Sequence, residues 1–246
     1  MKETSDTQPT RLRRVGHSFV AADGQLSELK DSLAGSSWDM VELDVLAFGD
    51  RLVVAHDRHD LELPDLIAFA DALETLREIL PPNVEINVDL KDTGYEQRVT
   101  DVLRSLGLID RVLISTMEPE SLPILRAAAP GLRLGWSVPK VRRNYLAHPL
   151  TRPGGYLMLA YLRHFLPRRI GEALRAGVAD AIMAHWGVVT PALCTEIRSL
   201  GKELYVWTVD DADRLIALDG LEVTGVITND GTVFERAGLG ARGRWD

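Results

Sequence analysis

Residues 84–91, with the sequence VEINVDLK, indicate the fold more clearly than any other stretch of the chain. Polar and apolar side chains alternate along it, and a strand directs alternate side chains to opposite faces. One face therefore carries Glu85, Asn87, Asp89 and Lys91, while the other is apolar. Two arrangements fit: an edge strand with one face in water, or a strand of a closed barrel whose polar face points into the barrel and its mouth. In a barrel, inward polar groups need a partner such as a cation, another charge or a substrate.

On both sides of this stretch, short β-branched runs alternate with longer helical patterns. The strand-like runs are 14–17, 40–46, 52–56, 84–90, 112–117, 132–138, 181–185, 203–209 and 225–228. The helical patterns are 25–33, 64–80, 95–106, 119–128, 155–176, 191–200, 212–218 and 232–237. A hairpin-length stretch containing Gly49-Asp50 separates the second and third runs, so we count them as one barrel position, which leaves eight.

Eight strand–helix repeats predict an α/β protein, a single-domain (β/α)8 TIM barrel. No glycine-rich dinucleotide fingerprint follows the first run, which argues against an open doubly wound sheet. We expect a flexible N-terminal tail at residues 1–13 and the barrel domain at residues 14–246.

The composition excludes several classes of protein. The chain has 246 residues and a formal net charge of −8, so we expect no nucleic-acid partner, because an acidic surface repels phosphates. The single cysteine, Cys194, excludes an internal disulfide and a cysteine-rich zinc site. The polar N-terminus lacks the apolar stretch of a secretory signal, and no run approaches the roughly 20 apolar residues that cross a bilayer. We therefore expect a soluble, cytoplasmic protein.

Three carboxylates stand near the carboxyl ends of neighbouring strands, where (β/α)8 barrels build their active sites. Glu42 and Asp44 flank Leu43 and so share a face, and Asp89 ends the next barrel strand. Carboxylates held together repel one another, and a divalent cation removes that penalty. An all-oxygen ligand set favours Mg²⁺, Ca²⁺ or Mn²⁺ over zinc. For the Glu-x-Asp pattern alone, the alternative is a strand end in contact with water.

Two histidines are expected at the same mouth. His17 ends the first run, and His56 ends the third, directly before Asp57. Either histidine alone is explained as well by a structural hydrogen bond. Together with the three carboxylates, they suit general acid–base catalysis on a phosphate ester: one imidazole accepts a proton and the other donates one to the leaving oxygen.

The ordered set of these motifs resembles the glycerophosphodiester phosphodiesterase family over nearly the whole chain, residues 14–230. The stretches that carry the resemblance are GH at 16–17, VELDV at 41–45, VVAHD at 53–57, INVDLK at 86–91, ISTMEPE at 114–120, YVWTV at 205–209 and GVITND at 225–230. The resemblance implies a (β/α)8 barrel and one divalent cation, Mg²⁺ or Ca²⁺. It also implies hydrolysis of a small glycerophosphodiester substrate to glycerol 3-phosphate and an alcohol.

The resemblance further implies roles for single residues. His17 and His56 match the family's acid–base pair. The metal ligands it implies are Glu42, Asp44 and Asp89, the last in place of the family's usual glutamate. Lys91 matches a lysine that contacts the substrate phosphate, and Trp207 matches an aromatic wall beside the site. In the family mechanism a hydroxyl of the substrate attacks phosphorus first, and water then opens the cyclic phosphate.

The chain departs from the family after its first histidine. The family usually has Arg-Gly there, and the arginine contacts phosphate, whereas here Ser18 and Phe19 follow His17. A hydroxyl cannot replace a charged, bidentate guanidinium, so Lys91 or an arginine elsewhere compensates, or phosphate binding is weak. Related spider-venom sphingomyelinase D enzymes also lack Arg-Gly and use an aspartate as their third ligand. Two alternatives therefore stay open: a phospholipase D-like activity on lysophospholipid or sphingomyelin-type substrates, and a catalytically weak protein that binds a phosphorylated ligand.

Two further features bear on substrates and partners. His185 ends a strand and, with Ser18, Lys91 and Trp207, completes the set of expected substrate contacts; for His185 a structural role is the alternative. Residues 142–169 mix arginines with aromatic and aliphatic residues, a composition that suits a helix lying on an anionic membrane surface. The alternative there is an ordinary barrel helix after a long loop. The sequence leaves the oligomeric state open.

Overall fold

The structure, a computed structural model, describes residues 11–20, 26, 37–140 and 152–240. Its strands are β1 (Arg13–Gly16), β2 (Met40–Phe48), β3 (Arg51–Val54), β4 (Glu85–Leu90), β5 (Val112–Thr116), β6 (Arg133–Val138), β7 (Ala181–His185), β8 (Glu203–Trp207) and β9 (Gly225–Thr228). Its helices are α2 (Phe69–Ile79), α3 (Glu96–Ser105), α4 (Ser121–Ala128), α5 (Arg152–Arg175), α6 (Pro191–Ser199), α7 (Ala212–Asp219) and α8 (Val233–Arg236). Short 3-10 turns lie at η2 (Asp60–Glu62), η3 (Ile109–Arg111) and η4 (Trp186–Val188).

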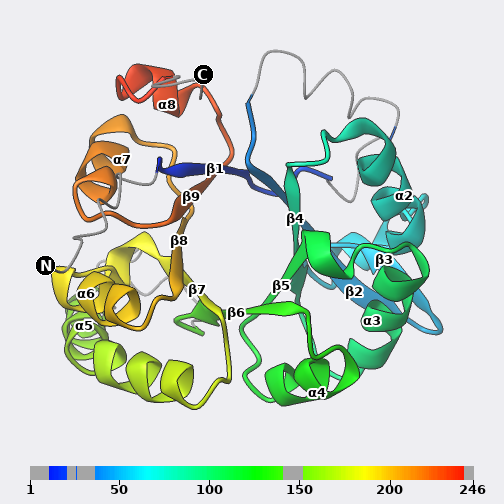
Figure 1. Ribbon diagram of the computed structural model, residues 1–246, viewed down its shortest axis with the longest axis horizontal. Coiled ribbons are helices and arrows are strands. Elements are labelled where there is room, and N and C mark those ends of the chain that lie inside the picture. Colours follow the sequence, from blue (N-terminus) through cyan, green and yellow to red (C-terminus); the bar gives the residue numbers. More distant parts are fainter. Residues whose placement is uncertain (1–10, 21–25, 27–36, 141–151, 241–246) are drawn as a thin grey trace, which may run out of the picture.

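Eight parallel strands close into a ring. The sheet runs in the order β1-β9-β8-β7-β6-β5-β4-β2-β3, and an additional pairing of β1 with β2 closes the ring, with β3 attached antiparallel to β2. Figure 1 views the ring of strands end-on and shows the helices arranged around its outside. The predicted (β/α)8 barrel is confirmed, and every predicted strand is present with its ends displaced by at most two residues.

Some element boundaries differ from the sequence-based expectation. β1 begins at Arg13 and Leu12 is buried, so the barrel includes residues that we assigned to the tail. α2 begins at Phe69 rather than at residue 64, because Ala68 forms a bridge with Val53 that holds the preceding chain extended. α5 begins three residues earlier than expected. The helix expected at residues 25–33 lies outside the described residues, apart from residue 26.

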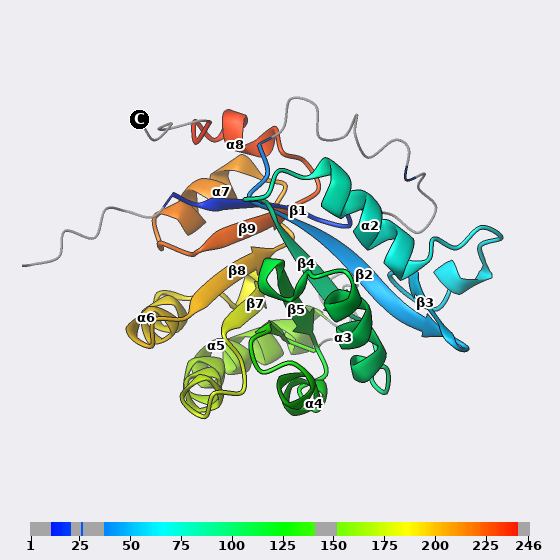
Figure 2. The same cartoon turned by 45° about the vertical axis from the view of Figure 1, so that its right-hand side comes forward.

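The hairpin of β2 and β3 corrects our expectation for His56. β2 continues past the barrel to Phe48, and β3 returns antiparallel, with Val54 opposite Val45. Figure 2 shows the two strands extending outward together beside α2. His56 therefore follows an antiparallel strand rather than ending a barrel strand. It still reaches the mouth, because the hairpin brings the chain back to the level of Asp44, whose carbonyl accepts the amide of Ala55 at 3.3 Å.

The polar face of β4 points into the barrel, which excludes the edge-strand alternative. β4 lies between β2 and β5, and its apolar residues Ile86, Val88 and Leu90 are buried in the layer beneath the helices.

At the amino-terminal end of the barrel, the first residues of four strands form a network of ion pairs. These residues are Arg13, Glu85, Arg133 and Glu203. The network satisfies Glu85 and leaves the opposite end of β4 available for chemistry.

Candidate active site

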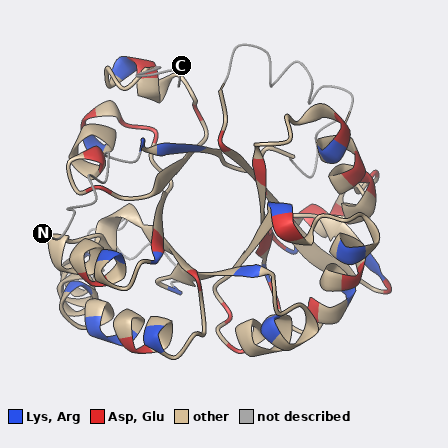
Figure 3. Cartoon of the chain, viewed as in Figure 1, with Lys and Arg blue, Asp and Glu red and all other residues tan. Residues whose placement is uncertain are grey.

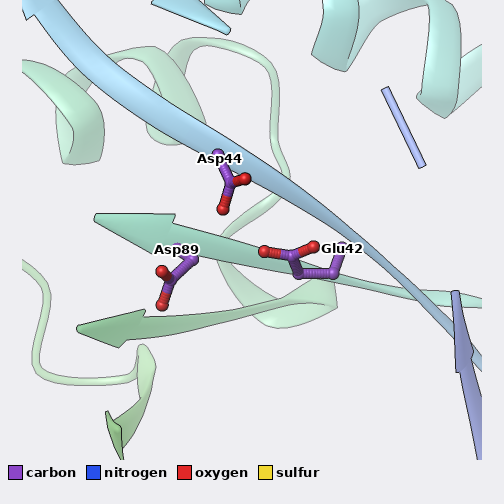
Figure 4. Close-up of side chains that lie close together, drawn as sticks. All are labelled: Glu42, Asp44 and Asp89. Atoms are coloured by element: carbon purple, nitrogen blue, oxygen red, sulfur yellow. The ribbon is translucent and has the colours of Figure 1, made fainter. Parts of the chain in front are cut away.

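Three carboxylates converge where β2 and β4 lie side by side. The strand register places Glu42 opposite Asn87 and Asp44 opposite Asp89. One ligand oxygen from each of Glu42, Asp44 and Asp89 lies within 4.8 Å of the others, and Figure 4 shows the three groups facing a common space. All three residues are buried, at 4%, 3% and 9% exposure respectively. Such a concentration of buried negative charge is costly unless a positive charge compensates for it.

Lys91 supplies part of that compensation. Its Nζ lies 2.6 Å from Asp44 Oδ1 and 2.8 Å from Asp89 Oδ2. Burial alone would lower the pKa of Lys91, but the charges of Asp89 and Asp44 outweigh it and raise that pKa. Burial would likewise raise the pKa of Asp44, and the charge of Lys91 reverses the shift and lowers it. Asp44 and Lys91 are therefore both charged at neutral pH.

The pKa of Glu42 shifts in the opposite direction to that of Asp44. Burial raises the pKa of Glu42 well above its ordinary value, and the charge of Asp44 and a hydrogen bond with that carboxylate add to the rise. Lys91 thus favours the ionised form of Asp44, while burial beside Asp44 favours the protonated form of Glu42. A cation bound among them would take the place of that proton.

A hydrogen-bonded pair of polar residues fixes the orientation of Asp89. The hydroxyl of Ser115 donates to Asp89 Oδ1, and Asn87 Nδ2 donates to the hydroxyl oxygen of Ser115 at 3.2 Å. Asn87 and Ser115 are both 1% exposed. We did not single out Ser115 from the sequence, although it lies two residues after Leu113 and thus on the inward face of β5.

Ser18 contacts the carboxylate cluster directly. Its backbone amide donates to Glu42 Oε2 at 2.6 Å, and its hydroxyl lies 3.4 Å from Asp44 Oδ2. Its φ angle is 42°, in the left-handed region that residues other than glycine seldom adopt. The turn after β1 thus aims the amide of Ser18 at Glu42, at a cost of about 1 kcal/mol in backbone strain.

His17 is held by a polar chain that begins on the loops after β8 and β9. Its Nδ1 lies 2.8 Å from Asn229 Oδ1, while Asn229 Nδ2 donates to Asp210 Oδ2 at 2.8 Å. Burial raises the pKa of Asp210, but hydrogen bonds from Asn229 and Thr228 outweigh it and keep that pKa low. Since the amide nitrogen of Asn229 faces an ionised Asp210, its oxygen faces His17. Nδ1 of His17 is therefore the donor, which leaves Nε2 as the basic nitrogen.

His56 follows β3 and is more open to solvent than His17. Its side chain is 61% exposed, and its positive form contributes to lowering the pKa of Asp44. The turn that carries it is fixed by Asp60, whose Oδ2 accepts the backbone amides of His56 and Asp57 at 2.7 and 3.2 Å. The carboxylate of Asp57 lies 4.0 Å from His56 Nδ1.

His185 and Trp207 form a separate pair at the ends of β7 and β8. Their ring centroids lie 5.1 Å apart in an edge-to-face arrangement, and Trp207 Nε1 donates to the carbonyl of Met183 at 2.9 Å. His185 Nδ1 accepts the amide of Gly187. Burial and the nearby charge of Arg214 lower the pKa of His185, so its ring is neutral at neutral pH.

Of the residues predicted from sequence, Glu42, Asp44, Asp89, Lys91 and Ser18 therefore contact one another directly. His17 is joined to this group through Ser18, the next residue in the chain, and His56 through its charge interaction with Asp44. Within the described part of the chain, His185 and Trp207 contact each other, the carbonyl of Met183 and the amide of Gly187, not the carboxylates. Sequence reasoning assigned no role to Asn229, Asp210 or Ser115. The position of Asn229, directly after the last predicted barrel strand, is a signal from which the sequence could have identified it.

The carboxylate cluster fits a divalent cation of the hard type. It offers three oxygen donors and no sulfur or imidazole among the described residues within the same distance, which suits Mg²⁺ or Ca²⁺ better than zinc. The pKa of Glu42 is raised by burial and by the charge of Asp44, so positive charge added among the carboxylates would favour its ionised form. Glu42, Asp44 and Asp89 would hold the cation.

Comparison with known proteins supports this chemistry. Residues 59–232 match the glycerophosphoryl diester phosphodiesterase family. A curated relative from Mycobacterium tuberculosis, named "probable glycerophosphodiester phosphodiesterase 2", is 26% identical over 236 residues, covering 84% of this chain and 81% of its own.

Solved structures share the barrel at lower identity. A glycerophosphodiester phosphodiesterase from Parabacteroides distasonis superposes with a TM-score of 0.68 at 15% identity, covering 94% of this chain and 100% of its own. An Oleispira antarctica phosphodiesterase, solved with the product sn-glycerol-3-phosphate, gives a TM-score of 0.61 at 16% identity, with 92% and 96% coverage. Similarity at this level shows the fold alone.

Proposed function

Since this chain belongs to the glycerophosphoryl diester phosphodiesterase family, we propose that it hydrolyses glycerophosphodiesters to glycerol 3-phosphate and an alcohol, and that His17 and His56 transfer the protons. The observation that carries the proposal is the convergence of Glu42, Asp44 and Asp89 at the barrel mouth, with Lys91 between two of them. A divalent cation bound there supplies positive charge to the phosphate oxygens and stabilises the charge that develops during displacement at phosphorus.

His17 is suited to accept the first proton. The Oδ1 atom of Asn229 accepts a hydrogen bond from Nδ1–H of His17, so the lone pair of Nε2 is free to receive the proton of an attacking hydroxyl. Asp210, behind Asn229, keeps the ring in that tautomer and stabilises the imidazolium that forms. The geometry is that of a base with a positioning group and a carboxylate behind it.

His56 is suited to donate the second proton. It is close enough to Asp44 for their charges to interact, and exposed enough to meet a departing alcohol. When the P–O bond breaks, the leaving oxygen takes a proton from the imidazolium of His56. If the substrate's own hydroxyl attacks first, as the family resemblance implies, water opens the cyclic phosphate in a second step with the two roles exchanged, which restores both histidines.

The remaining predicted contacts surround this centre. Lys91 carries a positive charge that can meet a phosphate oxygen, and the hydroxyl of Ser18 lies beside Asp44. Trp207 and His185 form a neutral, largely apolar wall at the ends of β7 and β8, which suits the alcohol portion of a substrate. We assign the alcohol to that side because the charged side is occupied by the carboxylates and Lys91.

The test is release of glycerol 3-phosphate from glycerophosphocholine, with Mg²⁺ or Ca²⁺ added. We expect turnover that EDTA abolishes and that His17→Ala or His56→Ala each lowers by at least about a hundredfold. His59→Ala is the matched control, because His59 is an exposed histidine three residues from His56, and we expect it to retain wild-type activity. A wild type no faster than the His17 and His56 variants would instead indicate a protein that binds a phosphorylated ligand. Faster cleavage of lysophosphatidylcholine offered alongside would indicate the phospholipase D-like alternative.

A further inference from the structure

A stripe of exposed apolar side chains runs along α5, outside the site described above. Of the eight large apolar side chains exposed among the described residues, five belong to this helix. They are Tyr156, Leu157, Met158, Tyr161 and Phe165, from 51% to 74% exposed. Single exposed apolar residues are ordinary on protein surfaces, whereas a cluster of this kind marks an interaction site.

Helical spacing makes the stripe continuous. Leu157, Tyr161 and Phe165 follow one another at intervals of four residues and so lie on one face. The rings of Tyr161 and Phe165 have centroids 4.6 Å apart, and Met158 is next to Leu157. The helix buries Leu166 and Ile170 on its other side, against the barrel. The face that carries the stripe therefore looks away from the core.

The stripe lies at the catalytic end of the barrel. Arg163 Nε donates to the carbonyl of Gly187 at 2.8 Å, and Gly187 belongs to η4, which directly follows the carboxyl end of β7. Leu159, one turn earlier, also lies beside Gly187. Barrel helices run opposite to the strands, so the part of α5 before Leu159 continues past the rim, over about 10 Å at 1.5 Å per residue.

The charge of α5 is opposite to that of the whole chain. Within Arg152–Arg175 there are five arginines and one acidic residue, Glu172, although the chain carries a net charge of −8. Arg168 pairs with Glu172 on the helix itself, and Arg175 pairs with Glu196 on α6. Figure 3 shows the basic positions as blue bands along α5. An apolar stripe with a basic excess complements an anionic lipid surface, where apolar groups enter the interface and arginines meet phosphates.

We propose that α5 docks the protein onto anionic phospholipid surfaces through Leu157, Met158, Tyr161 and Phe165, with the barrel mouth beside the lipid headgroups. A second copy of the chain is a less suitable partner for the stripe, because a two-fold symmetric contact would place two basic helices against each other. A stable dimer also needs about 800 Å² of buried surface from each partner. Docking itself is independent of the proposed hydrolysis. Its consequence, that the site acts on phosphodiesters at or released from a membrane surface, rests on the proposed function.

The test is co-sedimentation with vesicles of phosphatidylcholine containing about one third phosphatidylglycerol. We expect the wild type to bind these vesicles at low salt and to bind vesicles of pure phosphatidylcholine far less. The double variant Leu157→Glu/Phe165→Glu should lower the bound fraction at least about fivefold. The matched control Ile124→Glu/Ile216→Glu changes two equally apolar side chains, 49% and 50% exposed on α4 and α7, and should bind like the wild type.

Several results would overturn the proposal. It fails if the wild type does not bind anionic vesicles, or if both double variants lose binding to the same extent. It also fails if light scattering shows a dimer that only the α5 variant dissociates, since the stripe is then an interface between copies. Melting temperatures and hydrolysis of soluble glycerophosphocholine, measured on the same samples, show whether a variant has unfolded. His17→Ala should bind vesicles like the wild type, so a failure of the proposed catalysis leaves the docking result interpretable.

Discussion

Among the described residues, Lys91 supplies the ammonium group that contacts the carboxylate cluster, and replacing it with methionine removes that charge while keeping a side chain of similar length. Lys91 Nζ makes two ion pairs, at 2.6 Å with Asp44 and at 2.8 Å with Asp89. The side chains are 21%, 4% and 13% exposed respectively, so solvent screens these pairs little. Removing one partner of a buried pair costs about 3–5 kcal/mol, because the other charge stays buried without compensation. The partial exposure of Lys91 favours the lower end, about 3 kcal/mol.

The assay is thermal unfolding with and without divalent cation. For a chain of this size about 3 kcal/mol corresponds to a fall in melting temperature of about 6–12 °C, measured in EDTA. Added Ca²⁺ or Mg²⁺ should raise the melting temperature of Lys91→Met by more than that of the wild type, because the cation then replaces the positive charge that the variant has lost.

Lys140→Met is the matched control. Lys140 also pairs with a carboxylate, Glu118, but it is 40% exposed, so its pair is worth less than about 1 kcal/mol and its loss should lower the melting temperature by less than about 4 °C. The reasoning is refuted if Lys91→Met melts in EDTA at the wild-type temperature. It is equally refuted if the cation stabilises the variant no more than it stabilises the wild type.

Two further predictions concern the opposite end of the barrel and the positioning of His17. Burial would raise the pKa of Glu85, but hydrogen bonding with Arg133 and the charge of Arg13 hold that pKa below its ordinary value. The ionised form of Glu85 therefore stabilises the folded protein above about pH 4.3, and this contribution is lost as pH falls through the lowered pKa. Glu85→Gln should therefore cost about 1–2 kcal/mol at pH 7, and melting curves from pH 7 to pH 3 should show the difference from wild type shrinking; a constant difference contradicts this. Asn229→Ala removes the acceptor from His17 Nδ1 and should lower kcat about 10–100-fold with little change in KM or melting temperature, together with a shifted pH profile of kcat. An unchanged pH profile with a lowered melting temperature would show a structural role for Asn229 instead.

The sequence predicted those parts of the site that depend on strand periodicity. Glu42 and Asp44 share a face because they are two residues apart on one strand, and Asp89 joins them because β4 pairs with β2 in register. Both facts follow from short-range patterns and from the order of strands in a (β/α)8 barrel. The same periodicity assigned the polar face of β4 to the barrel interior once the ring was expected to close.

The parts that sequence reasoning missed depend on contacts distant in the chain or on local turns. Asn229 reaches His17 only because β9 pairs with β1 when the barrel closes, across 212 residues of sequence. His56 reaches the mouth by an antiparallel hairpin, and nothing in the run 52–56 shows that the strand ends at Val54. Ser115 occupies an inward position that could equally have held an apolar residue. In each case the residue type is visible in the sequence, but its neighbour is not.

The charges of the cluster explain why such a costly arrangement suits a cation site. With all groups ionised, Glu42, Asp44 and Asp89 outnumber Lys91 by two negative charges, and burial resists this, so the pKa of Glu42 rises. Protonation of Glu42 halves the imbalance, whereas a divalent cation with Glu42 ionised removes it. Lys91 thus stabilises Asp44 and Asp89 while leaving uncompensated negative charge that would attract a cation. Had a second lysine balanced the cluster fully, the carboxylates would be more stable together and would bind a cation less readily, because the cation would have to displace a charge already satisfied.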